Sequence, residues 1–274
     1  MKHTVILASL LAVMMFTVAA IAADDGSAIT KTGQCETNWT KKTIVCTGSA
    51  APNLKGGVVP AQIRLSTERA ADLDAYRRIL EAVKGVNIDS KDTIGAQMQS
   101  NPEVKARVEG LIKGMKRLDT RYYADGGVDV VVEVSLDGAV TEAVVKASDK
   151  KVREADKGDF PAKYTGMVVD ARGLKVVPAL APKILDQNGK EIYGSGGISA
   201  DVLKSTGMVA YVKNIDAAKK NAKVTDNPIM VKAVKLSDNG KSDLVLSAED
   251  SAKLNSKDFS TQFLNNGRVV VVID

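Results

Sequence analysis

Two neighbouring stretches, in which apolar residues recur at different spacings, constrain the fold of this chain more than any other feature. Apolar residues recur every four positions in Ala71–Val83, a spacing typical of the buried face of a helix, and Ser66 is a suitable first residue for it. Just before this helix, the apolar residues of Gly56–Leu65 predict a strand. A strand followed by an amphipathic helix indicates a sheet with a helix packed on it.

The segment Arg121–Leu136 has the pattern of a β-hairpin. Valine alternates with mostly polar residues in Val128–Ser135, and Asp125–Gly127 supplies a turn. Before this hairpin, Asn101 and Pro102 are the residue types preferred at an N-cap and a first helical position, so a second helix is expected there. Helices and a hairpin in this order predict an α+β domain.

A charged stretch divides the chain. Residues 146–159 are rich in lysine and aspartate and contain few large apolar side chains, which is typical of a linker or of a solvated helix end. On either side, residues 56–145 and 160–274 are each long enough for a small domain. We therefore expect two small domains, each with a mixed set of helices and strands.

The C-terminal domain is expected to contain a second sheet. Its last strand is apolar on both faces, as is typical of a strand inside a sheet that is covered on both sides. Ser247 and Asp250 have the pattern of a capping box before a short helix. The expected strands are Gly166–Val169, Met208–Val212, Ile229–Leu236, Asp243–Leu246 and Arg268–Ile273.

Residues 1–22 have the composition of an export signal. Val5–Ile21 is almost wholly apolar, and Ala20–Ala22 has the small-x-small form that signal peptidase accepts. The run is shorter than the roughly 20 residues of a membrane-spanning helix, although an uncleaved N-terminal anchor is the alternative. We expect cleavage before Ala23 and a mature protein in the periplasm, outside the cell or on its outer surface.

The two cysteines fit an exported protein. Cys35 and Cys46 flank a short segment within residues 23–55, and two cysteines at this spacing predict one disulfide across a hairpin. A metal site is a poor alternative, because two thiolates would need further ligands. The expected fold is thus α+β, with two small mixed α/β-sheet domains after a disulfide-closed N-terminal hairpin.

Histidine is absent after the leader, and this excludes many kinds of catalysis. The one histidine, His3, lies within the expected signal peptide. The mature chain therefore has no imidazole base, no Ser-His or Cys-His couple and no histidine metal ligand. The formal charge of +5 is spread over lysines interleaved with acids, which disfavours nucleic-acid binding. We expect a protein that is not an enzyme and that holds no metal or cofactor.

Two segments carry a resemblance to known families. Glu68–Asp89, "ERAADLDAYRRILEAVKGVNID", resembles the helix-and-strand signature of the LPP-twenty bacterial lipoprotein family and the N-terminal domain of the flagellar assembly protein T family. Arg121–Leu136 is similar to the paired strands of those families, so the resemblance covers Gly56–Leu136. It implies a non-enzymatic cell-envelope protein, a structural or assembly module with outer-membrane or flagellar-base partners. The lipoprotein cysteine is missing, which puts lipid anchoring in doubt.

One acid–base pair is a candidate site. Asp170 and Arg172 follow the predicted strand Gly166–Val169, and they either fasten a loop or form a catalytic site. The segment is faintly similar to the Asp-x-Arg-Gly-Asn form of some processing proteases, but Leu174 replaces the asparagine. We favour the loop. The alternative is a carboxylate-based cell-wall hydrolase centred on Asp170.

A glycine-rich turn is the second candidate site. Ser195, Gly196 and Gly197 precede a helix capped by Ser199, and backbone amides in such a turn can hold a small anion. The protein would then be a periplasmic anion binder, although an ordinary turn is the preferred interpretation. The consecutive pair Tyr122–Tyr123 predicts one tyrosine facing the core and one available for contact.

Overall fold

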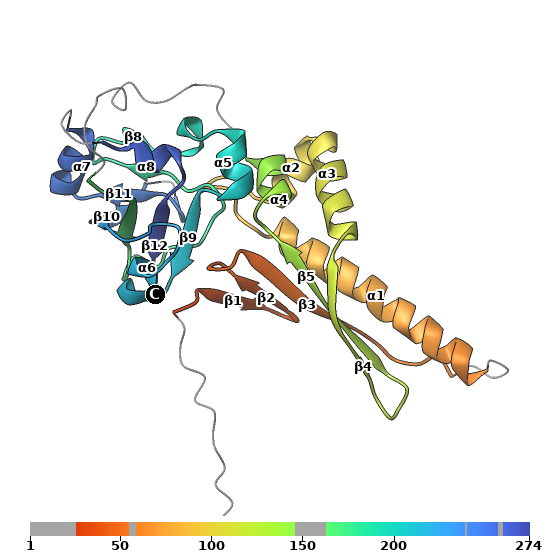
Figure 1. Cartoon of the computed structure of the whole chain (residues 1–274). Coiled ribbons are helices and arrows are strands. Elements are labelled where there is room, and N and C mark those ends of the chain that lie inside the picture. Colours follow the sequence, from red (N-terminus) through yellow and green to blue (C-terminus); the bar gives the residue numbers. More distant parts are fainter. Residues whose placement is uncertain (1–25, 55–58, 146–162, 239, 257–259) are drawn as a thin grey trace, which may run out of the picture.

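The structure is a computed structural model that describes residues 26–54, 59–145, 163–238, 240–256 and 260–274 (Figure 1). The expected signal peptide 1–22 and the charged segment 146–159 lie outside the described residues. The expected α+β fold is confirmed, because helices accompany two separate sheets. We call residues 26–145 the N-terminal module and residues 163–274 the C-terminal module.

Five antiparallel strands form the sheet of the N-terminal module. They are β1 (Ile29–Thr32), β2 (Cys35–Asn38), β3 (Thr43–Ala50), β4 (Lys116–Tyr122) and β5 (Val128–Ser135), in the order β1-β2-β3-β5-β4. The predicted hairpin Arg121–Leu136 is confirmed as the turn between β4 and β5.

The predicted disulfide is present. Cys35 of β2 lies directly opposite Cys46 of β3, and their sulfur atoms are bonded. The boundary expected between residues 55 and 56 does not separate two units, because β1, β2 and β3 pair into the same sheet as β5 and β4. The apolar face of the hairpin needs the same covering helix as β5, so the two segments share one core.

The long helix α1 (Pro60–Lys84) lies across one face of this sheet (Figure 1). Its buried residues fall on every fourth position from Thr67 to Val83, as the sequence pattern predicts. The predicted strand Gly56–Leu65 is wrong, because the described residues from Pro60 onward are helical. Pro60 sits in the first turn, where its missing N–H breaks no hydrogen bond, and this lets the helix begin before Ser66.

α1 packs against β3 at very short range. Gly48 of β3 lies directly under Ala71 and Ala75, and a Cβ atom at Gly48 would overlap the backbone of both helical residues. Ala71 and Ala75 are themselves fully buried. Small residues on both sides of the contact therefore set the distance between the helix and the sheet.

Three shorter helices complete the N-terminal module. They are α2 (Ile94–Ser100), α3 (Pro102–Lys113) and α4 (Ala139–Val144). The predicted cap of α3 is confirmed, because the side-chain oxygen of Asn101 accepts hydrogen bonds from the backbone N–H groups of Glu103 and Val104.

The sheet of the C-terminal module has seven strands in the order β8-β7-β11-β10-β6-β12-β9. Their bounds are β6 (Gly166–Asp170), β7 (Ile184–Leu185), β8 (Glu191–Tyr193), β9 (Val209–Val212), β10 (Pro228–Leu236), β11 (Leu244–Leu246) and β12 (Val269–Val272). The helices that accompany them are α5 (Ala200–Ser205), α6 (Ile215–Lys219), α7 (Ala248–Asn255) and α8 (Gln262–Asn265). The five predicted strands correspond to β6, β9, β10, β11 and β12.

The last strand, β12, lies inside the sheet, as its sequence predicts. It pairs in parallel with β6 on one side and with β9 on the other, and all four of its residues are buried. Val269 and Val271 face the main hydrophobic core, whereas Val270 and Val272 belong to a smaller core that includes Ala218 of α6. An all-valine strand suits this position because both of its faces are covered.

The two modules meet at a buried junction. Tyr211 of β9 packs edge-on against Trp39, with their ring centroids 6.0 Å apart. The Thr40 hydroxyl donates to the backbone oxygen of Tyr211 at 2.5 Å. On the other side, the N–H of Leu180 donates to the carbonyl of Asn87 at 2.9 Å. The main core accordingly includes side chains of both modules.

Tyr211→Phe is expected to lower the free energy of unfolding by about 2 kcal/mol. The Tyr211 hydroxyl donates to the Ala179 carbonyl at 2.9 Å and accepts from the Ala179 N–H at 3.0 Å, and the ring is fully buried. Phenylalanine would leave both backbone groups without this partner in an apolar environment. Urea unfolding measures the loss. Tyr122→Phe, which removes an exposed hydroxyl, is the control, and an equal loss in the two variants would contradict the prediction.

Candidate functional site

The pair predicted from the sequence, Asp170 and Arg172, lies at the carboxyl end of β6. The Nε and Nη2 atoms of Arg172 donate to the two oxygens of Asp170 at 2.8 and 2.7 Å. The next residue, Gly173, donates its N–H to the Asp274 carboxylate. The pair thus closes a turn that is also attached to the end of the chain.

This geometry is a poor one for acid–base catalysis. The hydrogen bonds from the Arg172 side chain hold the pKa of Asp170 below its usual value, so the carboxyl is ionised at neutral pH and does not serve as an acid. Both of its oxygens already accept bonds from Arg172. The contacts therefore favour the loop-fastening interpretation over a hydrolase.

The glycine-rich turn forms a single 3₁₀ turn over Ser195–Gly197. It borders a hollow of about 200 Å3 that Glu191 also lines. A Cβ atom at Gly194 would overlap the Glu191 carboxylate, so a negative charge already lies against the turn. The Nζ atom of Lys183 lies 3.7 Å from the Oε2 atom of this carboxylate, but the Oε1 atom faces the turn and disfavours an anion there, so the arrangement gives no support to a small-anion site.

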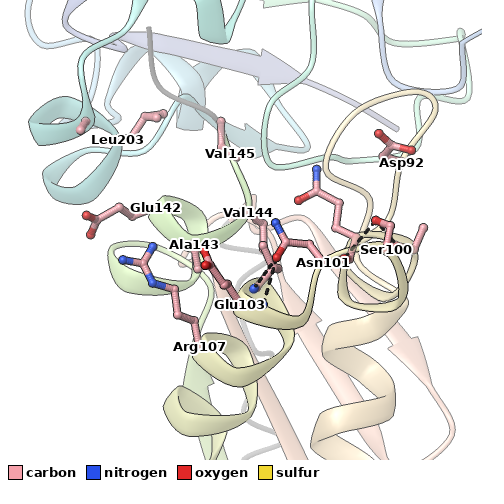
Figure 2. A pocket seen from close by; sticks show the side chains of 14 residues that line it. Asp92, Ser100, Asn101, Glu103, Arg107, Glu142, Ala143, Val144, Val145 and Leu203 are labelled. Atoms are coloured by element: carbon pink, nitrogen blue, oxygen red, sulfur yellow. Dashed lines mark hydrogen bonds between the residues drawn. The ribbon is translucent and has the colours of Figure 1, made fainter. Parts of the chain in front are cut away.

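A broad groove lies between the modules, beside α2, α3, α4 and α5, and has a volume of about 740 Å3. Figure 2 shows Glu103, Arg107 and Glu142 along one side and Asp92 at the other end. The described residues contain no group of three or more His, Cys, Asp or Glu side chains arranged to hold a metal ion. The groove is a mixed-charge, solvated surface and supplies no clear reacting group.

A cluster of exposed apolar side chains lies at the far end of the N-terminal module. There, the start of α1 and the β4–β5 turn project away from the C-terminal sheet (Figure 1). We call this surface the apolar end. Its most exposed members are 74% and 57% accessible, at Leu54 and Val59. Leu54, Ile63, Tyr122 and Tyr123 line one hollow together with Pro60, and Val59 directly precedes Pro60. The residues of the apolar end are Leu54, Val59, Ile63, Tyr122 and Tyr123.

Two tyrosines give the apolar end a fixed shape. The Tyr122 hydroxyl donates to Glu68 at 3.0 Å, and the Tyr123 hydroxyl donates to Asp129 at 2.7 Å. The guanidinium of Arg64 lies over the Tyr122 ring, 4.3 Å from its centroid. These contacts hold two half-exposed rings in place before any partner binds, which lowers the entropy cost of binding.

A shallow hollow of about 470 Å3 lies between these rings and the start of α1. Pro52, Pro60 and Ile63 form its apolar walls, and Arg64 contributes the one cation of its lining. Rigid aromatic rings beside an arginine are the residue types enriched where proteins bind other proteins. The chemistry of the hollow suits an apolar side chain of a partner.

Hydrogen bonds shift the pKa values of two ionisable groups at this surface. The bond from Arg117, followed by the bond from Tyr122, lowers the pKa of Glu68. The bond to Asp129 raises the pKa of Tyr123. Both groups keep their neutral-pH charge states, so the surface presents the same contacts across the ordinary pH range.

Sequence reasoning found only part of the apolar end. It predicted one tyrosine of the pair Tyr122–Tyr123 in the core, yet both are about half exposed, because β4 is the edge strand and its end extends beside the first turn of α1. It missed Val59 and Ile63 because it placed them in a buried strand. Pro60, a residue type preferred in the first turn of a helix, is the sequence signal that would have placed them at a helix start.

The comparison with protein families concerns the C-terminal module. Residues 166–274 match the family described as Treponema pallidum Tp0624, second domain. The match begins at the first residue of β6 and contains the whole seven-stranded sheet. The C-terminal module is therefore similar to a domain that occurs in a Treponema protein. No curated protein matches this chain. Within the described part of the chain, no helix is both long and apolar enough to cross a membrane.

Proposed function

We propose that this protein is a non-enzymatic, exported cell-envelope protein that acts as a structural or assembly module and binds a protein partner through the apolar end. One observation carries the proposal. Of the eleven large hydrophobic side chains that are exposed in the described residues, four belong to the apolar end: Leu54, Val59, Tyr122 and Tyr123. Clusters of this kind are uncommon on surfaces that face only water and are typical of contact sites.

The free energy for binding would come from burying these side chains. Leu54 and Val59 are more than half exposed, and each buried Å2 of apolar surface contributes about 25 cal/mol. The tyrosines add large rings that are already positioned by Glu68 and Asp129. The surface thus combines apolar area with a low ordering cost, which is the combination that a protein contact requires.

Three features support an envelope location. The N-terminal sequence has the form of an export signal. The Cys35–Cys46 disulfide is typical of oxidising compartments outside the cytosol. The resemblance of Gly56–Leu136 to the LPP-twenty and flagellar assembly protein T families supports partners in the outer membrane or the flagellar base. The apolar end lies within that same stretch, apart from Leu54.

Crosslinking in the cells that make the protein is expected to join the tagged chain to an envelope protein. The double variant Leu54→Ser/Val59→Ser should reduce recovery of that partner about tenfold or more, because interface anchors each contribute about 2 kcal/mol. Both side chains are highly exposed, so the variant should fold normally. Mass spectrometry of the crosslinked product identifies and quantifies the partner.

The matched control is Val234→Ser. Val234 is an exposed valine on β10 of the C-terminal module, away from the apolar end. Its substitution should leave recovery unchanged. Recovery of the monomer alone from wild-type cells, or equal recovery with the double variant, would overturn the proposal.

A further inference from the structure

Three charged side chains lie together at the junction between the modules. Lys42 comes from the turn between β2 and β3, and Asp137 comes from the loop after β5. Lys223 comes from the C-terminal module, in the turn after α6. The Nζ atoms of the two lysines and the carboxylate of Asp137 thus bring two positive charges and one negative charge from both modules to one place.

Lys42 is buried, whereas the side chain of its partner Asp137 is 36% exposed. Lys42 is only 2% exposed, and its Nζ lies 3.5 Å from Oδ1 of Asp137. Neither of these two buried atoms makes a hydrogen bond. A buried ammonium group that loses its carboxylate partner destabilises the protein, because little water reaches the charge to solvate it.

Backbone atoms of the C-terminal module close over this pair. The Nζ of Lys223 donates to the carbonyl oxygens of Thr206 and Gly207, the latter at 3.0 Å. A Cβ atom at Gly207 would lie 2.6 Å from Oδ1 of Asp137 and 3.5 Å from Nζ of Lys42. Gly207 has a φ of +63°, which favours glycine there in any case. The cluster is therefore part of the contact surface itself.

A junction that served only to hold the modules together would be stronger with apolar side chains at these positions. Here the second cation, Lys223, approaches a pair in which the ammonium group of Lys42 already balances the single carboxylate of Asp137. We propose that this cluster makes the contact between the modules depend on pH: proton uptake at Lys223 loosens the junction, and proton loss tightens it. The proposal concerns the junction and is independent of binding at the apolar end.

The direction follows from the proton affinity of Lys223 in the closed and open junction. Burial, and next the charge of Lys42, lower the pKa of Lys223 from the usual 10.5 to about 7, and Asp137 opposes them. Burial lowers the pKa of Lys42 as well. Lys42 and Asp137 are the charged groups that act on Lys223 from the opposite module, and the α5 end presents carbonyls. An open junction would return Lys223 to water and to its usual pKa.

The open form therefore binds the proton more tightly than the closed form between about pH 7 and pH 10.5. Within that window, falling pH favours opening, and the stability of the junction rises with pH. Below about pH 7, Lys223 is protonated in both forms, so it adds no further pH dependence to the opening equilibrium. The proton of Lys223 should change the opening equilibrium by up to about tenfold per pH unit, and Lys42, whose pKa is also lowered by burial, adds a change of the same sign.

Hydrogen exchange of the full chain tests the proposal. The amides of Leu180, Ala181 and Lys213 donate across the junction, to Asn87, Ile88 and Gly26. Their protection factors should rise about tenfold per unit between about pH 7 and about pH 9. In Lys223→Gln, which keeps a neutral donor for the carbonyls, the part of this rise that is due to Lys223 should disappear, and only the contribution of Lys42 should remain. Lys220→Gln, at an exposed lysine of the same turn, should keep it.

A second variant decides the matter if Lys223→Gln does not fold. Lys42→Met removes the neighbouring cation, so the pH above which protection begins to rise should move upward by about one unit. Three results would overturn the proposal: pH-independent protection in the wild type, an unchanged rise in Lys223→Gln, or a rise that begins at the same pH in Lys42→Met as in the wild type. Equal protection of junction amides and of Val168 in the sheet centre would also overturn it, since the modules would then separate only on complete unfolding.

Discussion

Gly48→Val is expected to lower the free energy of unfolding by about 4 kcal/mol. Even one added carbon at Gly48 would overlap the backbone of Ala71 and Ala75, so valine must push α1 away from β3. Backbone atoms cannot rotate aside as the end of a flexible side chain can. The shift would open the contact between the helix and the sheet around Ile79 and Ile44, which are fully buried.

Urea unfolding followed by circular dichroism measures this effect. Gly110→Ala is the matched control, because Gly110 lies in α3 and nothing lies within 4 Å of an added Cβ atom there. Alanine should stabilise that helix by up to about 1 kcal/mol. A Gly48→Val protein as stable as the wild type would show that α1 does not pack against β3 at this distance.

Removing the disulfide by Cys35→Ser with Cys46→Ser is expected to cost about 3 kcal/mol. The two cysteines are 11 positions apart, and the bond closes the β2–β3 hairpin, so its loss gives the unfolded chain more conformational freedom. Cys46 is also fully buried, and serine would place a hydroxyl in the core. The loss should appear as a lower urea midpoint.

Reduction of the wild-type protein separates these two contributions. Reductant breaks the bond but leaves both sulfur atoms in the core, so its effect on the midpoint measures the cross-link alone. The serine variant should be less stable than the reduced wild type. An unchanged midpoint in reductant, with free thiols verified, would contradict a stabilising role for the bond.

Local patterns predicted the elements that depend on local chemistry. In a strand, successive side chains point to opposite faces of the sheet. The alternation of valine with mostly polar residues in Val128–Ser135 therefore indicates one buried face, and the consecutive valines of β12 indicate two. The Asn101 and Ser247 caps identify helix starts because their side chains bond to backbone N–H groups two or three residues away. Such signals need no knowledge of the rest of the chain.

Long-range contacts could not be predicted in this way. The start of α1 was misplaced for a different reason: Gly56–Leu65 is apolar enough for a strand, and this pattern outweighed Pro60, the local signal of a helix start. Lys42 reads as an ordinary turn lysine, yet it is buried because Asp137 and Gly207, far away in the sequence, close over it. The sequence showed Asp170 and Arg172 close together, but it did not show that the two side chains hydrogen-bond to each other and close a turn.

The placement of α1 has a mechanical consequence. Its last residue, Lys84, leads through Asn87 into the junction, and its first residue, Pro60, lies at the apolar end. A helix of 25 residues is about 37 Å long, at about 1.5 Å per residue. It is a lever arm, and a tilt of roughly 10° at the junction would carry its far tip through about 6 Å. A partner held at that tip would therefore be displaced by any change in how the two modules meet.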